Sequence, residues 1–331
     1  MNLQTIVHIP KSSFEISHQS KILLLGSCFS ENMGAKLLEH KFDVHVNPFG
    51  IMYNPFSIHR GINRLLDKIA FTEGEFILHN DLYHSFMHHG SFSGASLDEA
   101  VSAVNDKFIS ASQQLENADV LLITFGTSYI FRWKETDEVV SNCHKIPADK
   151  FIRQRLTIEE ITVKWTELLQ RILYVNQGIK IVFTVSPIRH FKDGAHENQL
   201  SKAILHLSVD KLMSKFSENL FYFPAYEIVI DQLRDYRFYT DDMLHPSTLT
   251  QNYIWRRFSD TFFSVETEGI NSEWKKLFQS LSHRPYNINS EAYQSFLHRT
   301  IEELETFEKR YPFLSCFHEK QRLTQLLNHS H

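Results

Sequence analysis

The 331-residue sequence lacks features that mark several common classes of protein. No run approaches the ~20 apolar residues of a membrane-spanning helix, so we expect no contact with a membrane. The first residues do not combine a basic segment with an apolar core of about 7–15 residues, so we expect no secretory signal peptide. The sequence also contains no internal repeat and no low-complexity tract. These absences favour a cytoplasmic globular protein.

Cysteine is scarce, and the three cysteines are Cys28, Cys143 and Cys316. An odd number of widely separated cysteines provides neither a disulfide framework nor the spacing of a zinc site. Such a set is typical of a reducing compartment, where a thiol stays available for chemistry. We expect no cofactor.

Neither sign of charge dominates, since 34 Lys and Arg face 39 Asp and Glu for a net charge of −5. The chain therefore has no global attraction to nucleic acid. With 42% hydrophobic residues it has ample material for a core. Its length exceeds the ~100–200 residues of one domain without requiring two complete cores. We predict a main α/β domain over residues 1–263 and a helical extension over 264–331 packed on it; the oligomeric state is left open.

The extension is predicted from a stripe of apolar side chains. They are Trp274, Leu277, Phe278, Phe296, Ile301, Leu304 and Phe307. Such stripes usually pack against the rest of the protein. Binding of a partner protein is the alternative.

Short apolar segments predict the strands of a sheet. They lie at residues 21–26, 119–125, 180–185 and 219–223, with a weaker fifth at 43–47. Helix-like segments separate them, and this alternation is typical of a parallel sheet flanked by helices. Helix starts are indicated by Asn54-Pro55 and by capping boxes that begin at Ser96 and Thr157. Ligands bind at the carboxyl ends of such strands, where the candidate site residues occur.

The first strand ends in a tight turn that carries a thiol. Gly26 permits the turn, and Ser30 is predicted to N-cap the helix that follows. Cys28 would then lie just before a helix N-terminus, where the helix dipole and free N–H groups favour a thiolate and an oxyanion. This strand-turn-helix elbow suits a nucleophile. The alternative is that Cys28 is a small buried residue, as free cysteines often are.

Late in the chain, Asp242 precedes His245-Pro246 by three residues. In a single turn this spacing lets the carboxylate reach one ring nitrogen, which leaves the other nitrogen free as a general base. The alternative is a helix cap with a surface histidine. Cys28, Asp242 and His245 can form a triad in space, because triads are defined by geometry rather than by chain order.

These motifs and several others resemble the GSCFA family, which is itself similar to the SGNH/GDSL hydrolases. The matching motifs are Gly26-Ser27-Cys28-Phe29-Ser30, Asn47-Pro48-Phe49-Gly50, Asn54-Pro55, Phe125-Gly126-Thr127, Asn142-Cys143-His144-Lys145, Ser186-Pro187, Arg189-His190, Tyr226-Glu227, Arg234-Asp235-Tyr236 and Asp242 with His245-Pro246. Ser30 stands where the family name has Ala. The resemblance covers about residues 20 to 260 and implies an SGNH-hydrolase-like (flavodoxin-like) fold, a three-layer α/β/α arrangement with a five-stranded, mainly parallel sheet.

The resemblance also implies roles in the elbow. The SGNH opening block is Gly-Asp-Ser, and an ungapped match to Gly26-Ser27-Cys28 places the nucleophile at Cys28. Ser27 remains the rival nucleophile if the turn is shifted by one residue. The thiol is favoured, since it is intrinsically the stronger nucleophile and gains from a helix N-terminus and an imidazole.

The oxyanion hole of SGNH enzymes uses the nucleophile's N–H, a Gly of the second block and an Asn of the third. This implies Cys28 and Gly50 here. The third block departs from the pattern, because Thr127 follows Gly126 where an Asn is expected. A hydroxyl donates one hydrogen bond but lacks the reach of an amide. Asn54 and Asn142 are the alternative donors.

Further side chains are predicted to contact the substrate. They are Asn54, Asn142, His144, Arg189 and His190. Arg189 would bind a carboxylate or phosphate through its bidentate fork. It would equally pair inside the protein with Asp193 or Asp235, and for Arg234 and Arg237 we favour such structural roles.

The densest group of histidines, His84, His88 and His89, raises the question of a metal. A catalytic zinc needs three protein ligands with supporting contacts, and no Glu lies between these histidines as in metalloproteases. The segment also fits a strand or loop beside the site. Cys143-His144 is interpreted as a loop over the site. We predict no metal site.

Together these features predict an SGNH-like acyl-ester hydrolase, with a carbohydrate or small-metabolite acyl ester as substrate and O-deacetylation as one form of the reaction. Cys28 attacks, His245 is the base and Asp242 orients His245. An acyltransferase on the same scaffold is one alternative. A non-catalytic ligand-binding protein that keeps the scaffold is another.

Overall fold

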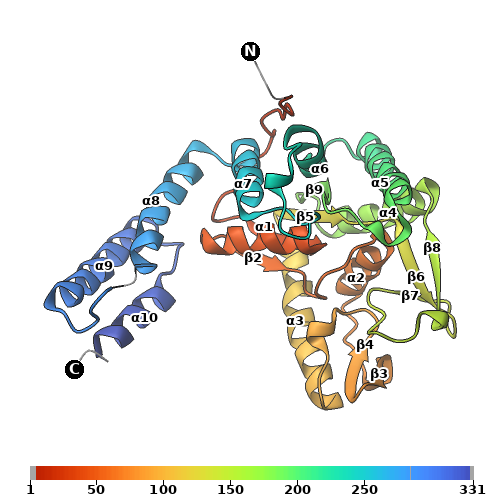
Figure 1. Ribbon diagram of the computed structural model, residues 1–331, viewed down its shortest axis with the longest axis horizontal. Helices are drawn as coiled ribbons and strands as arrows, with labels where there is room; N and C mark the ends of the chain where they lie inside the picture. Colours follow the sequence, from red (N-terminus) through yellow and green to blue (C-terminus); the bar gives the residue numbers. More distant parts are fainter. Residues whose placement is uncertain (1–4, 284, 329–331) are drawn as a thin grey trace. The chain divides into compact units, whose positions relative to one another are not determined.

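The computed structural model describes residues 5–283 and 285–328. Its main sheet has five strands. The strands are β1 (Lys21–Gly26), β2 (Asp43–Val46), β5 (Val120–Phe125), β9 (Lys180–Val185) and β10 (Leu220–Tyr222). Their order is β10-β9-β5-β1-β2, and β1, β5, β9 and β10 run parallel. Counted in chain order this is 2-1-3-4-5, the flavodoxin-like arrangement. Figure 1 labels β2, β5 and β9 of this sheet. The predicted fold is confirmed, and each strand lies within one residue of its expected ends.

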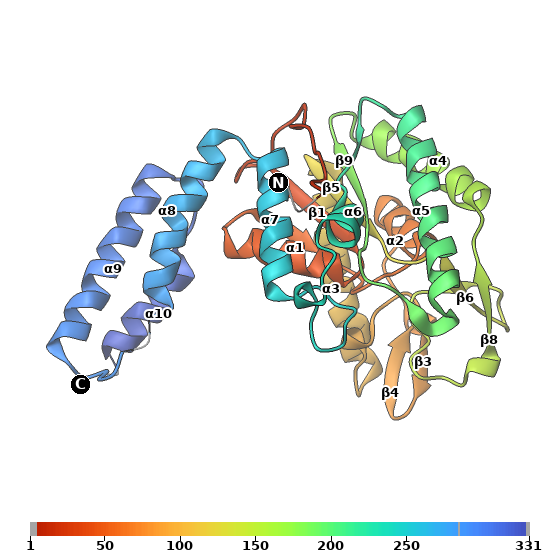
Figure 2. The same ribbon diagram turned by 45° about the horizontal axis from the view of Figure 1, so that its top comes forward.

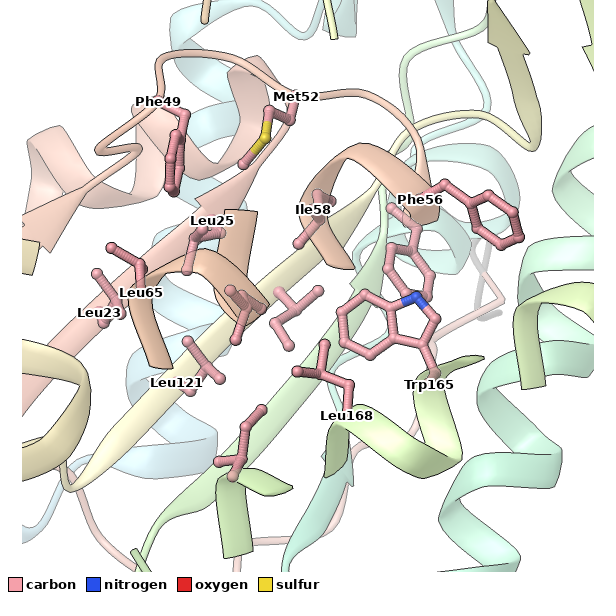
Figure 3. Packing of buried hydrophobic residues seen from close by; sticks show 14 of the residues in the cluster. Leu23, Leu25, Phe49, Met52, Phe56, Ile58, Leu65, Leu121, Trp165 and Leu168 are labelled. Atoms are coloured by element: carbon pink, nitrogen blue, oxygen red, sulfur yellow. The ribbon is translucent and has the colours of Figure 1, made fainter. Parts of the chain in front are cut away.

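One face of the sheet packs against four helices. They are α2 (Pro55–Asp67), α3 (Leu97–Asn117), α4 (Ile158–Val175) and α5 (Ala195–Lys215). Alternate residues of a strand point to the same face, and Leu23, Leu25 and Leu121 accordingly share one hydrophobic cluster with these helices. Trp165 of α4 is fully buried among them, beside Leu168 and Phe56 (Figure 3). This cluster is the hydrophobic core between the sheet and the four helices, and it holds the strands and their carboxyl ends in place.

The opposite face buries the alternate side chains, such as Ile22 and Leu24. Helices α1 (Cys28–Glu39) and α7 (Thr248–Phe262) lie along it, and the short α6 (Ala225–Glu227) precedes α7 (Figure 2). Phe223 and Phe258 of α7 pack edge to face with ring centroids 5.3 Å apart. The sheet is therefore covered on both faces, as the α/β/α prediction requires.

Three helices begin where their caps were predicted, and Ser96 caps α3 by accepting a hydrogen bond from the Glu99 N–H at 3.2 Å. Asn54 caps α2 by accepting a hydrogen bond from the Ser57 N–H at 2.8 Å. Thr157 and Glu160 form the expected capping box of α4. The prediction for Ser30 is wrong, since α1 begins at Cys28 and the Ser30 hydroxyl instead donates to Thr124 Oγ1 at 2.8 Å.

Two small sheets lie outside the main one. The first is the hairpin of β3 (Phe76–His79) and β4 (Leu82–Ser85), and the second contains β6 (Tyr129–Trp133), β7 (Val139–Val140) and β8 (Phe151–Arg155) in the order β7-β6-β8. The His84-to-His89 segment is thus a strand followed by a turn, one of the predicted alternatives. The β6-β8 sheet was not predicted.

The chain forms two compact units. One contains Lys21–Lys36 and Val44–Thr261, and the other contains Ser12–Ser20, Leu37–Asp43 and the C-terminal region from Phe262. The second unit includes α8 (Val265–Leu281), α9 (Glu291–Arg310) and α10 (Phe317–Asn328), whose own core includes Trp274, Leu304 and Phe307. The C-terminal helices are confirmed, while their packing on the main domain stays a prediction. No described helix has the length and apolar character needed to cross a bilayer.

Candidate active site

A cavity of about 450 Å³ opens at the carboxyl end of the main sheet, within the first unit. The predicted site residues that line it are Ser27, Cys28, Asn54, Thr127, Asn142, Arg189, His190 and His245. Cys28 follows β1 and Thr127 follows β5, so the cavity lies at the point where the strand order reverses. Ligands bind at this switch point in open α/β sheets.

The turn after β1 requires glycine. The Gly26 φ angle is +146°, and a Cβ there would lie 2.4 Å from the Thr124 carbonyl oxygen. The Gly26 N–H donates to the Asn47 side chain at 2.9 Å. Because the strand is held this closely on both sides, the next two residues are presented at a fixed place on the cavity wall.

Ser27 and Cys28 have different surroundings in this turn. Ser27 is 1% exposed, and its hydroxyl oxygen accepts a hydrogen bond from the Phe29 N–H at 3.3 Å. Cys28 is half-buried, begins α1 and carries a free thiol. The serine hydroxyl oxygen is thus bonded to the first turn of the helix, and the choice between Ser27 and Cys28 as nucleophile stays a prediction.

The environment of Cys28 does not favour a resting thiolate. Burial raises the pKa of the thiol, and the Glu31 carboxylate raises it further. The N–H groups of Cys28 and Phe29 and the charge of Lys202 lower this pKa, but their effect is smaller. The expectation of a thiolate stabilised by the helix N-terminus is therefore not supported. The raised pKa favours the protonated form of this thiol at neutral pH.

Lys202 does not line the cavity but bonds to the backbone beside it, which the sequence motifs did not reveal. It lies on α5 and is 2% exposed, and its Nζ donates to the carbonyl oxygens of Gly126 and Ser186 at 2.6 Å each. Burial lowers the pKa of this lysine from 10.5 to about 7. The side chain ties together the carboxyl ends of β5 and β9 and places partial positive charge near Cys28. The only sequence signal is its place in the buried stripe of α5, three residues before Leu205.

His245 and Asp242 make the contact that their spacing predicts. The two side chains are joined by a 2.5 Å hydrogen bond between His245 Nδ1 and Asp242 Oδ2. The other carboxylate oxygen, Oδ1, accepts from the N–H groups of Leu244 and His245 and from the Thr240 hydroxyl at 2.8–2.9 Å. These donors hold the pKa of Asp242 well below its usual value. Within the described residues His245 Nε2 has no hydrogen-bond partner, so it is available to a group in the cavity; the catalytic role stays a prediction.

Gly50 does not reach the cavity. Its N–H donates to the Asn47 carbonyl oxygen at 2.7 Å, and the residue is buried with a φ of +75°. A Cβ at this position would lie 2.3 Å from the Cβ of His89. The glycine is therefore needed for a tight turn and close packing, and we withdraw it from the oxyanion hole.

Two asparagine amides and one hydroxyl are the other candidate donors. Asn54 lines the cavity but uses its amide on Ser57, with Nδ2 donating to the hydroxyl at 2.9 Å. Thr127 shares its hydroxyl with Ser201 at 3.1 Å. Asn142 accepts from the His144 N–H through Oδ1, and its Nδ2 has no partner in the described chain. Asn142 therefore has the most available amide.

His144 is placed away from the cavity, against the prediction that it contacts substrate. Its Nε2 is 2.9 Å from the Ser85 carbonyl oxygen, and its ring stacks on His84 with centroids 4.4 Å apart. Burial lowers the pKa of His144 to about 4. The neutral ring packs in the interior, while the neighbouring Asn142 and Cys143 line the cavity.

The histidine group around His84 is bonded within the protein. His84 Nδ1 lies 2.6 Å from the Ser93 hydroxyl, and Nε2 lies 2.9 Å from the His79 carbonyl oxygen. Burial lowers the pKa of His88 to about 3. No group of three or more metal-binding side chains gathers in the part of the chain that the structure describes.

Comparisons with known proteins give a family and two distant structural likenesses. The chain is similar to a carbohydrate esterase family 3 protein from Talaromyces cellulolyticus, with 9% identity, a TM-score of 0.33, and coverage of 80% of this chain and 100% of that one. It is also similar to an acetyl xylan esterase (Est2A) from the rumen bacterium Butyrivibrio proteoclasticus, with 11% identity, a TM-score of 0.38, and coverage of 77% and 64%. Likenesses this distant carry no information on activity. No match was found among curated proteins.

The family is established by sequence models that cover most of the chain. The model of the GSCFA family matches residues 21–258, which include the elbow, the cavity and the Asp242–His245 pair. The model of the GSCFA domain protein, C-terminal domain, matches residues 274–329, the region of the C-terminal helices. The resemblance read from the motifs is thereby confirmed, and the chain belongs to the GSCFA family.

Proposed function

We propose that this protein is an acyl-ester hydrolase that uses Cys28 as its nucleophile. One observation carries the proposal: Cys28 and His245 line the same cavity, and His245 Nδ1 is held by Asp242. This leaves Nε2 as the only ring nitrogen that can take a proton from a group in the cavity. Cys28, His245 and Asp242 would then act as the nucleophile, the general base and the carboxylate that orients the base, as in a catalytic triad.

The reaction then proceeds in two stages. His245 Nε2 removes the thiol proton as Sγ attacks the acyl carbon, and the resulting tetrahedral oxyanion is bound by the Cys28 N–H and the Asn142 amide. The intermediate collapses, the alcohol leaves with the proton from His245, and a thioester remains on Cys28. His245 next removes a proton from water, the hydroxide attacks the thioester, and the acid departs as the thiol regains its proton.

The raised pKa of Cys28 is consistent with this order of events. A thiol that is protonated at rest needs His245 as a general base during the attack, in the manner of a serine hydrolase. The substrate class that suits the cavity is a small-molecule or carbohydrate acyl ester, and O-deacetylation is the simplest such reaction.

The test is hydrolysis of acetyl esters by three variants, Cys28→Ala, His245→Ala and Asp242→Asn. General base catalysis contributes about 10²–10⁴-fold, so we expect losses of at least that size for His245→Ala without loss of the folded state by circular dichroism. Cys143→Ala is the matched control, because this second thiol lines the same cavity. Full turnover in His245→Ala would rule out the mechanism, and binding of an ester without turnover in the unmodified protein would indicate a ligand-binding protein.

A further inference from the structure

The charged side chains on the cavity wall all carry positive charge. Within the described residues they are Arg153, Arg189 and Lys192, and no Asp or Glu lines the cavity. The whole chain has a net charge of −5, so this local excess of positive charge runs against the overall balance. A low-dielectric cavity lined by one sign of charge attracts ligands of the opposite sign.

Arg153 is neutralised inside the protein. Its Nε donates to Asp193 Oδ1 at 3.0 Å, and its Nη2 pairs with the other carboxylate oxygen. The guanidinium also lies over the rings of Tyr129 and Phe131, at 4.5 and 4.8 Å from their centroids. Both oxygens of the Asp193 carboxylate are thus paired with the guanidinium, so we assign Arg153 a structural role.

Arg189 has no carboxylate partner in the described part of the chain. The two carboxylates that were expected as its internal partners bind other arginines. Asp193 pairs with Arg153, and Asp235 pairs with Arg237 at 3.4 Å. Its guanidinium lies 5.3 and 5.7 Å from the ring centroids of Phe191 and Tyr239 and shares a side-chain hydrogen bond with Tyr239, while its Nε is buried without a hydrogen-bond partner. A buried donor left unpaired is costly, which is expected where a ligand completes the bond.

Lys192 is the second cation without a carboxylate among the described residues. Its Nζ lies 4.9 Å from the ring centroid of Phe131, and it shares the cavity wall with Arg189. His190 lies between them in sequence and adds no charge, because burial lowers its pKa to about 4. Its Nε2 is likewise buried without a partner. Two cations and one neutral imidazole therefore line the cavity, and neither cation has a carboxylate partner among the described residues.

We propose that Arg189 and Lys192 bind an anionic group, a carboxylate or a phosphate, carried by the ester substrate. Arg189 supplies a planar fork that matches either anion, and Lys192 adds a mobile point charge. The inference rests on the proposed function in one respect, that the molecule bound here presents its acyl carbon to Cys28. The substrate class is thereby narrowed to acidic esters, such as acylated sugar acids or acylated phosphate compounds.

The test compares two alkylating reagents at Cys28, iodoacetate and its neutral analogue iodoacetamide. Both react with the same thiolate, so the ratio of their rates cancels the pKa of Cys28 and reports only the attraction of the cavity for a carboxylate. The rate at Cys28 is followed by peptide mass spectrometry in the full-length protein. A unit charge ~8 Å away at an effective dielectric constant of about 40 changes such a ratio by roughly sixfold.

We therefore expect the iodoacetate-to-iodoacetamide ratio at Cys28 to fall by about threefold to tenfold in each of Arg189→Gln and Lys192→Gln. Salt at about 0.5 M screens these charges, so it should reduce the difference in this ratio between each variant and the unmodified protein. Lys107→Gln is the matched control, since Lys107 also lies 4.9 Å over a phenyl ring, that of Phe92, but outside the cavity. An unchanged ratio in both cavity variants would overturn the proposal.

A second arm identifies the anion. Inorganic phosphate and glutarate are each tested for protection of Cys28 against iodoacetamide, in the unmodified protein and in the Arg189→Gln variant. Protection that the variant loses supports the proposal and names the favoured anion, while equal protection in both proteins, or none by either ion, contradicts it. These readouts need no turnover, so they separate a failure of this inference from a failure of the esterase activity.

Discussion

The burial of Lys202 predicts how the free energy of unfolding depends on pH. Lys202 is 2% exposed, and burial lowers its pKa to about 7, against 10.5 for an ordinary lysine. Between these two values the unfolded chain binds a proton that the folded chain does not, so the free energy of unfolding rises with pH. One pKa unit corresponds to about 1.4 kcal/mol, and the pKa difference therefore predicts a gain of about 2 kcal/mol from pH 7 to pH 9.

The perturbation is Lys202→Met, which keeps the length of the side chain and removes the titrating group. Unfolding by urea is followed by tryptophan fluorescence at pH 7, 8 and 9, with Trp274→Phe as the shared background. The remaining tryptophans, Trp133, Trp165 and Trp255, then all report on the unit that contains Lys202. Other titrating groups are common to both proteins and cancel in the comparison.

We expect stability to rise by about 2 kcal/mol more in the parent than in Lys202→Met over this pH range. The exposed Lys107 provides the control, and Lys107→Met should retain the pH dependence of the parent. Parallel pH profiles in the parent and Lys202→Met would refute the reasoning, because they would show that Lys202 has the same pKa in the folded and unfolded chains.

Three further predictions concern the cavity and the core. Glu31→Gln should lower the pKa of Cys28, because the Glu31 carboxylate raises it, and the pH profile of iodoacetamide alkylation should move to lower pH; an unmoved profile would show that Glu31 has no such effect. Asn142→Ala should lower kcat by about 10²–10³-fold with little change in KM, as for the loss of one oxyanion donor, and steady-state kinetics showing a change in KM alone would assign Asn142 to substrate binding instead. Trp165→Ala should destabilise the first unit by about 3–5 kcal/mol in urea unfolding, since Trp165 is fully buried with its ring centroid 5.0 Å from that of Phe125; a cost below about 1 kcal/mol would contradict this packing.

Much of the fold could be predicted because its signals are local. The strands of the main sheet are short apolar runs, and Asn54 and Thr157 are N-cap residues that mark the start of the helices after them. The β6-β8 sheet escaped prediction because its strands are half-buried and are specified by pairing with each other, such as Tyr129 opposite Arg155. Such pairing between distant segments leaves a weak pattern in any one segment.

The site could be predicted only in part. The Asp242–His245 contact follows from a spacing of three residues in one turn, so the sequence alone was sufficient. Gly50 was misassigned because a tight turn and an oxyanion donor both favour glycine, and only the structure shows that its N–H is already bonded. Lys202 was missed because its burial depends on the carbonyl groups of two other segments.

The pKa of Cys28 shows why a motif does not fix reactivity. The helix N-terminus acts as predicted, since the N–H groups of Cys28 and Phe29 lower the pKa of the thiol. Burial and Glu31 outweigh them, and neither the depth of the cavity nor the distance to Glu31 can be read from the elbow motif. The electrostatic balance is a property of the folded site.

The most direct test of the account is to trap the acyl group on the protein. The unmodified protein, Cys28→Ala and Ser27→Ala are mixed with p-nitrophenyl acetate, quenched in acid within the first turnover and mapped by peptide mass spectrometry. We expect one acetyl group on Cys28 in the unmodified protein and none on the Cys28→Ala protein. Acetylation of Ser27, or continued turnover by Cys28→Ala, would show that Cys28 is not the nucleophile.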